Sequence, residues 1–180
     1  MTNTKQKLLE AKYFLERMIE NQAERDAFKY NVSAFLTAFR SVTMIMQKEF
    51  NKVSGFADWY QVQQEKMKAN DKMKLLNAKR TMTIHQQLVQ PRAHVNVSTT
   101  EHITLTDSMS VIVIRADGTR ERYGSAPPKP PATPAKTETT IQWRWYFDEI
   151  SDIDVVTVCQ ECQTELEAIV SECEQRFSSL

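Results

Sequence analysis

The chain has 180 residues, 41% of them hydrophobic and 26% charged, and this balance is typical of a globular protein rather than a disordered one. Lys and Arg together number 23, as do Asp and Glu, so the formal net charge is zero. No apolar run reaches the length of a membrane span, and the first residues lack the pattern of a signal peptide. We therefore expect a cytoplasmic protein with no membrane partner.

Four helices are predicted over residues 4–23, 24–52, 57–69 and 71–90. The second is the strongest, because its apolar residues recur at steps of three and four: Phe28, Val32, Phe35, Leu36, Phe39, Val42, Met46 and Phe50. Gly55 favours a turn after the second helix. Asn70-Asp71 can cap the fourth helix, and Pro91 follows the end of that helix. Short connections between four helices predict a bundle of mainly antiparallel neighbours over residues 1–92.

The pattern changes after Pro91 to one typical of strands. Residues 93–105 and 109–115 are rich in Val, Ile and Thr, and Asp117-Gly118 predicts a tight hairpin turn into a return strand over residues 119–123. Residues 125–140 hold five of the six prolines and are predicted to form a surface loop or linker. We expect residues 93–180 to pack on the bundle as one unit.

The last two predicted elements are a strand over residues 141–147 and a long helix over residues 153–177. In the strand, Trp143 and Trp145 alternate with Arg144 and Tyr146, which fits a half-buried strand better than a base-stacking platform. The helix carries a near-heptad apolar stripe that includes Cys159, Cys162 and Cys173. A closed zinc site generally needs four ligands, so we interpret these thiols as buried packing residues and expect no metal and no cofactor.

The charge is divided unevenly along the chain. Residues 1–93 hold 16 basic and 9 acidic residues, whereas residues 94–180 hold 7 basic and 14 acidic residues. The basic excess is dense near Lys72, Lys74 and Lys79, which makes these lysines candidates for binding an RNA backbone. The alternative is that they form a solvated helix face or dock the acidic C-terminal part.

Arg80 and His85 lie on the fourth predicted helix and suit phosphodiester chemistry. Arg stays charged and binds phosphate oxygens in a fork, while His exchanges protons near neutral pH. Positions five apart on a helix are rotated by roughly 140°, so the two side chains would flank a groove rather than meet. A second surface is needed to close such a site.

The first ninety residues resemble the HEPN superfamily of small helical-bundle proteins. The run from Phe28 to Val42 and the Arg80-x4-His85 spacing carry the resemblance. Where that superfamily often has Asn, Asp or His after the Arg, this chain has Thr81. For these residues the resemblance implies a four-helix up-and-down HEPN-like bundle. Together with the elements predicted after Pro91, the expected fold is mainly α: this bundle, a small antiparallel β element and a long C-terminal helix that packs back on the bundle.

The resemblance also implies a function. Its ribonuclease members cleave RNA without a metal, usually as dimers, and they occur in toxin and phage-defence systems. We therefore expect a homodimer in which His85 is the general acid or base, Arg80 stabilises the phosphorane and Thr81 supports them. RNA and a separate antitoxin are the expected partners. The alternative is a non-catalytic dimerisation or assembly module that recruits a protein partner.

Overall fold

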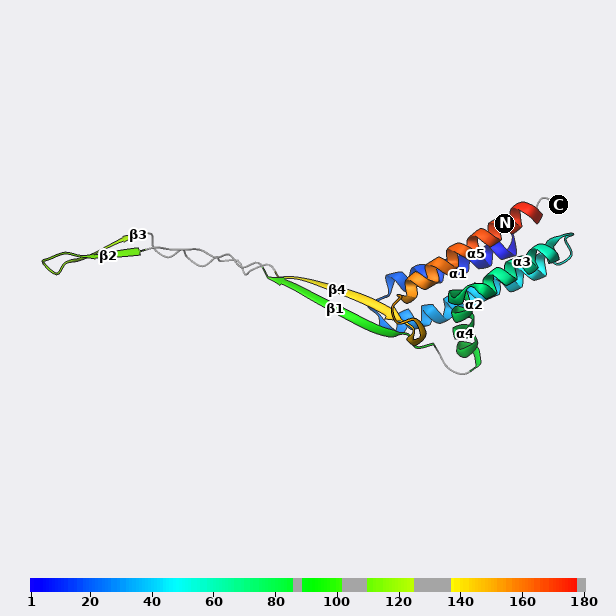
Figure 1. Ribbon diagram of the computed structural model, residues 1–180, viewed down its shortest axis with the longest axis horizontal. Helices are drawn as coiled ribbons and strands as arrows, with labels where there is room; N and C mark the ends of the chain where they lie inside the picture. The colour runs from blue at the N-terminus through cyan, green and yellow to red at the C-terminus, as the bar shows by residue number, and fades with distance from the viewer. Residues whose placement is uncertain (86–88, 102–109, 125–136, 178–180) are drawn as a thin grey trace. The chain divides into compact units, whose positions relative to one another are not determined.

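The computed structural model describes residues 1–85, 89–101, 110–124 and 137–177, and for residues 83–85, 101, 110 and 137 it describes the backbone alone (Figure 1). Within these residues the protein is mainly helical, with small two-stranded sheets, as the sequence predicts. The HEPN-like arrangement of four helices stays a prediction. The elements in chain order are α1 (Asn3–Glu20), α2 (Arg25–Phe50), α3 (Phe56–Ala69), α4 (Asp71–His85), β1 (Arg92–Glu101), β2 (Ser110–Ile114), β3 (Arg120–Gly124), β4 (Thr137–Tyr146), a short 3-10 helix (Asp148–Ile150) and α5 (Val155–Phe177).

The contacts group the chain into two units. The helical unit comprises residues 1–95 and 143–180, and the insertion unit comprises residues 96–142. Strand β1 pairs with β4, and β2 pairs with β3. The C-terminal helix α5 belongs to the helical unit and packs against α1, α2 and α4, which agrees with the predicted return of this helix to the bundle.

Helices α1, α3 and α4 each begin after a residue suited to that position. The Thr2 hydroxyl accepts a hydrogen bond from the Lys5 amide at 3.0 Å and caps α1. Gly55 precedes α3 with φ of +78°, a left-handed conformation that Gly adopts without steric cost. The Asn70 side chain accepts from the Lys72 amide at 2.9 Å, so the predicted cap of α4 is confirmed.

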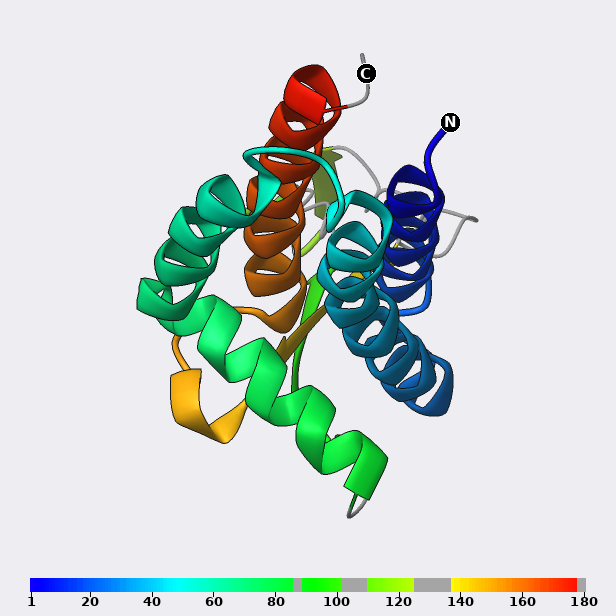
Figure 2. The ribbon, with the colours of Figure 1, turned by 90° about the vertical axis from the view of Figure 1, so that its right-hand side faces the viewer.

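The helical unit buries its apolar side chains in two clusters. One lies among α1, α2, α4 and α5 and includes Phe28, Phe35 and Cys159. The other lies toward the far ends of α2 and α5, where it meets α3 and includes Phe56 and Leu166. Figure 2 shows α4 running obliquely across this packed group of helices. The clusters explain the strong periodicity of α2, since its apolar face contributes to both.

The contacts of Trp145 hold the end of β4 against the helices. Trp145 is completely buried, its ring stacks on Phe28 at 4.3 Å between centroids, and its indole N–H donates to the carbonyl of Gln22 at 2.9 Å. The Trp145 backbone N–H donates to one carboxylate oxygen of Asp154 at 2.8 Å, while the other accepts from the Val156 amide at 2.8 Å. Asp154 therefore caps α5 and fixes the end of β4 at once. The predicted half-buried strand is confirmed at Trp145.

The insertion unit contains the β2–β3 hairpin that Asp117-Gly118 predicts. Its register pairs Val111 with Tyr123 and Ile114 with Arg120. At the turn, the Gly118 amide donates to the Arg115 carbonyl at 2.9 Å, and Gly118 has φ of +85°. The Asp117 carboxylate accepts from the Thr119 amide at 2.9 Å. This is a three-residue hairpin loop, in which the left-handed position explains the glycine.

The predicted limits of one loop were wrong. Residues 137–140 were assigned to the proline-rich segment, but they form the first part of β4. The prolines lie before this stretch, and Thr139 and Thr140 have the β-branched side chains that favour a strand. The helix predicted over residues 71–90 was also too long, because residues 89–90 are not helical. Several predicted stretches lie outside the described residues: residues 86–88 of that helix, residues 102–105 and 109 of the first two predicted strands, and residues 125–136 of the predicted loop.

Candidate functional site

The candidate site is the surface of α4, where the sequence places the Arg/His spacing and three lysines. Helix α4 packs against α2, α3 and α5 through Met73 and Leu76, which are buried in the core. The structure therefore describes how most of the predicted site residues lie relative to the helices around them.

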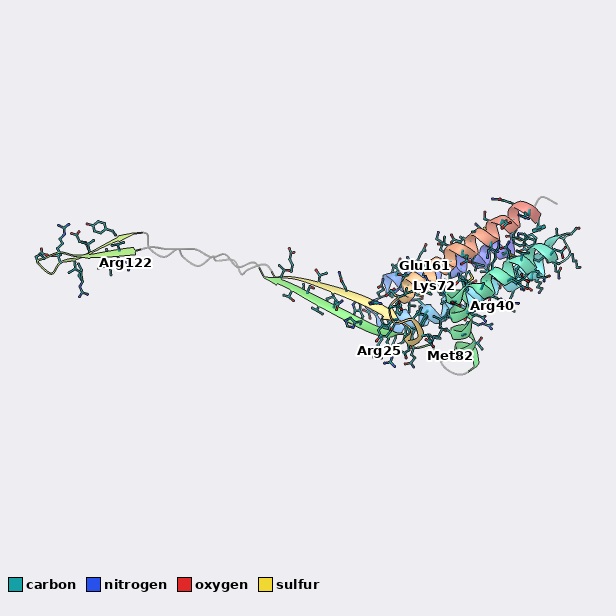
Figure 3. All side chains as sticks on the ribbon, in the orientation of Figure 1. Arg25, Arg40, Lys72, Met82, Arg122 and Glu161 are labelled. Carbon is teal, nitrogen blue, oxygen red and sulfur yellow. The ribbon has the colours of Figure 1, made fainter. Side chains whose placement is uncertain are left out.

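Each of the three candidate RNA-binding lysines faces a carboxylate. Lys72 forms an ion pair with Glu161 of α5, and Figure 3 labels both residues. Lys74 pairs with Asp71 one turn earlier at 3.0 Å. Lys79 pairs with Glu149 at 2.8 Å, and its side chain is only 11% exposed. One alternative from the sequence was that these lysines dock the acidic C-terminal part of the chain. The ion pairs of Lys72 and Lys79 show such docking.

Lys79 lies in a more enclosed setting than the other two lysines. Its ammonium group lies 5.1 Å from the centroid of the Phe147 ring as well as against Glu149. The hydrogen bond from Lys79 lowers the pKa of the Glu149 carboxyl below its ordinary value. In the same way, the hydrogen bond to Glu161 raises the pKa of Lys72. These contacts connect α4 to the segment that follows β4 and to α5.

The predicted catalytic residues are only partly described. Arg80 is half-buried, and its Nε atom is buried without a hydrogen-bond partner among the described residues. The Thr81 hydroxyl is exposed and donates back to the Asn77 carbonyl of its own helix at 3.0 Å. His85 is the last residue of α4, but its side chain lies outside the described ones. The structure therefore gives no Arg80–His85 geometry.

One family model matches almost the whole chain. It is described as bacteriophage lambda protein ea47, and it covers residues 1–177. The chain belongs to the bacteriophage lambda Ea47 family. No curated protein and no solved structure matches it.

The three thiols of this Ea47-family chain are packing residues, as the sequence predicts. Cys159, Cys162 and Cys173 are free and buried along α5. Burial raises the pKa of Cys159 well above its ordinary value, and it raises those of Cys162 and Cys173 to about 12. They are therefore protonated, unreactive thiols at neutral pH. Among the described residues, no group of His, Cys, Asp and Glu is placed to hold a metal ion.

Two features of the Ea47-family chain were not singled out from the sequence. One is the exposure of β2, and the other is a cleft between α2, α3 and α4 that Arg40 and Lys68 line. Arg40 follows Phe39 in a largely apolar helix. A cation beside an apolar stripe was the sequence signal that could have indicated the cleft. None of the helices that the structure describes is long and apolar enough to span a bilayer.

Proposed function

We propose that this Ea47-family chain is a cytoplasmic, non-catalytic assembly module, and that two copies pair through strand β2 of the insertion unit. The observation that carries the proposal is the exposure of β2. Ile112 and Ile114 are 60% and 64% exposed, and Val111 and Val113 on the other face are exposed as well. Large apolar side chains on both faces of one strand support a role in binding protein.

Among the described residues, the β2–β3 hairpin is a sheet of two strands only. A two-stranded hairpin is marginally stable in water, and stability usually requires a third strand or a packed face. Within the described residues, β2 pairs with β3 alone, which leaves the other edge of β2 available to a further strand. Adding strands at that edge would satisfy backbone groups and cover apolar side chains at the same time.

The two edges of the hairpin differ in chemistry, and the difference favours β2. Strand β3 begins with Arg120-Glu121-Arg122, and such charges protect an edge against pairing. Strand β2 reads Ser-Val-Ile-Val-Ile and carries no charge. We therefore infer that the partner pairs with the open edge of β2 rather than with that of β3.

A second copy of the chain is the partner that fits this edge. Val and Ile alternate along β2, so the strand has nearly the same apolar pattern in either direction. Two β2 strands paired antiparallel about a two-fold axis would therefore place similar side chains opposite each other. The result would be a four-stranded sheet with apolar strands at its centre and charged β3 strands at its rims, which is the usual distribution in interfaces.

A proline substitution tests the edge directly. The Arg115 amide donates to the Thr119 carbonyl at 2.9 Å, and alternation along the antiparallel ladder then directs the Ile112 N–H away from β3. Ile112→Pro removes this donor and spares the hairpin's own bonds, whereas Ile112→Val keeps it. Light scattering after size exclusion should give the mass of two chains for the wild type and for Ile112→Val, and of one chain for Ile112→Pro. A monomeric wild type, or a dimer that survives the proline, would contradict the proposal.

A metal-independent endoribonuclease of the toxin or phage-defence type, with RNA and an antitoxin as partners, stays a prediction. It is favoured by one observation, the buried Nε of Arg80, which lacks a hydrogen-bond partner among the described residues. The ion pairs of Lys72, Lys74 and Lys79 make the α4 surface less available to a phosphate backbone. The assembly module is therefore the better-supported proposal.

A further inference from the structure

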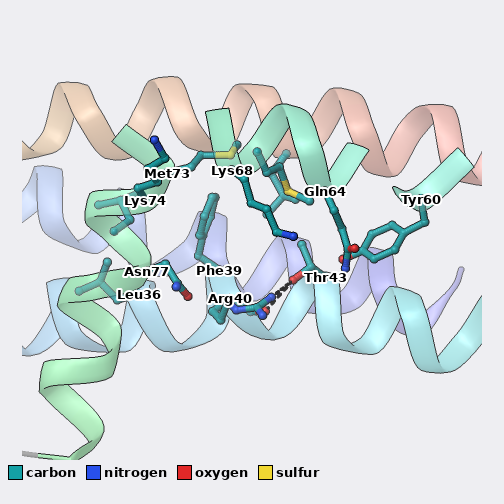
Figure 4. Close-up of a pocket in the computed structure, with 13 residues that line it drawn as sticks. Leu36, Phe39, Arg40, Thr43, Tyr60, Gln64, Lys68, Met73, Lys74 and Asn77 are labelled. Carbon is teal, nitrogen blue, oxygen red and sulfur yellow. Dashed lines mark hydrogen bonds between the residues drawn. The ribbon is translucent and has the colours of Figure 1, made fainter. Parts of the chain in front are cut away.

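A cleft opens between helices α2, α3 and α4 of the helical unit, next to the candidate site on α4. Its volume is about 210 Å³, and apolar side chains line it: Leu36 and Phe39 from α2, Met67 from α3 and Met73 from α4. Figure 4 labels Leu36, Phe39 and Met73 among these residues. Three cations lie at its margin: Arg40, Lys68 and Lys74. Among the described residues that line it, none is acidic.

Lys74 is paired with Asp71, but the other two cations at this cleft are not neutralised by a carboxylate of the described residues. Figure 4 shows Lys68 extending from α3 toward α2, so that its nitrogen approaches the place where Arg40 donates to the Thr43 hydroxyl. Among the described residues, neither Arg40 nor Lys68 has a carboxylate partner. Two like charges that converge over an apolar floor repel each other, and a bound anion would remove the repulsion.

The geometry around Arg40 suits a phosphate. A guanidinium has five donors in a planar fork, and one hydrogen bond to Thr43 leaves most of them available. Lys68 supplies a second charge from the opposite wall, and the Asn77 side chain of α4 points into the same space. Two unpaired cations match the two negative charges of a phosphate monoester better than the single charge of a carboxylate.

We infer that this cleft binds a small phosphate monoester with an apolar or aromatic body, the phosphate lying between Arg40 and Lys68 and the body on Phe39, Met67 and Met73. Ligand pockets for drug-sized molecules span roughly 300 to 1,000 Å³, so this smaller cleft selects a compact ligand. The inference rests on the helical unit and is independent of β2 pairing.

Methionine methyl signals provide the measurement, because Met67 and Met73 line the cleft whereas Met18 is buried elsewhere in the core. The full-length chain, labelled at its methionine methyl groups, is titrated with phenyl phosphate while two-dimensional NMR spectra are recorded. We expect saturable shifts of Met67 and Met73 with no shift of Met18. Phenol and inorganic phosphate, each carrying half of the ligand, should bind at least tenfold more weakly.

Three charge variants complete the test. Arg40→Gln and Lys68→Gln should each weaken phenyl phosphate binding roughly tenfold or more, as expected for a lost hydrogen bond to a charged group. Lys66→Gln removes the same charge from the same helix, but Lys66 does not line the cleft, so binding should be unchanged. Lys68 is exposed, so its variant keeps the test valid if Arg40→Gln fails to fold. Absent shifts, equal binding of phenol, or equal losses in Lys66→Gln and Lys68→Gln would overturn the inference.

Discussion

Replacing Asp154 should show how strongly the end of β4 is tied to α5. In Asp154→Ala, the Val156 amide loses its cap and the Trp145 amide loses the acceptor that it reaches at 2.8 Å. Loss of a cap costs about 1 kcal/mol. A buried donor left without a partner costs about 1 to 3 kcal/mol. The free energy of unfolding of the helical unit should therefore fall by about 2 to 4 kcal/mol.

The assay is urea unfolding followed by tryptophan fluorescence, since Trp145 leaves its stack with Phe28 when the unit unfolds. Asp152→Ala is the matched control, because Asp152 is exposed and lies two residues away. Its cost should stay within about 0.5 kcal/mol, as is usual for surface substitutions. Asp154→Asn keeps one acceptor oxygen and should lose about half as much as the alanine variant. A loss below about 1 kcal/mol for Asp154→Ala, or one equal to that of the control, would refute the assigned role.

Three further predictions concern titration and catalysis. The hydrogen bond from Lys79 lowers the pKa of Glu149, so this contact stabilises the fold at pH values above the ordinary pKa of 4.5. The stabilisation is lost as the pH falls through the folded-state pKa. In urea unfolding at several acidic pH values, the free energy of unfolding should therefore fall less in Lys79→Met than in the wild type. The pKa of Cys162 is raised from 9.0 to about 12, so the unfolded chain ionises first and stability should fall as the pH rises above about 9, less steeply in Cys162→Val. The same unfolding measurement checks it, and equal slopes for both proteins would contradict it. If the ribonuclease prediction holds, the wild type should cleave labelled RNA in EDTA and leave 2′,3′-cyclic phosphate ends. Arg80→Ala and His85→Ala should not cleave it. Equal cleavage by all three proteins would point to a contaminant.

The helices were predictable because their physics is local. The apolar spacing of Phe28, Val32 and Phe35 defines the buried face of α2, and Asn70 caps α4 as its side chain allows. The hairpin also followed from a local signal, since Asp117-Gly118 supplies both the side-chain acceptor and the left-handed residue of the turn. The thiols of α5 were placed correctly because they fall on its apolar stripe.

The partners of charged residues were not predictable in the same way. Lys72 meets Glu161 across 89 positions of sequence, and Lys79 meets Glu149 across 70. No local pattern specifies such pairs, so the sequence left open whether these lysines bind RNA, face the solvent or dock the acidic C-terminal part. The cleft with Arg40 and Lys68 was missed for the same reason, because it exists only where three helices meet.

The discontinuous make-up of the helical unit has a consequence for how this family can diversify. The segment of residues 96–142 leaves through β1 and returns through β4, and these two strands pair with each other. Its ends are thus held together, and closing a flexible loop costs only about 0.6 kcal/mol more for each doubling of its length. We therefore expect members of this family to differ in the length and sequence of this segment, while the packing of Phe28 on Trp145 keeps the helical unit unchanged.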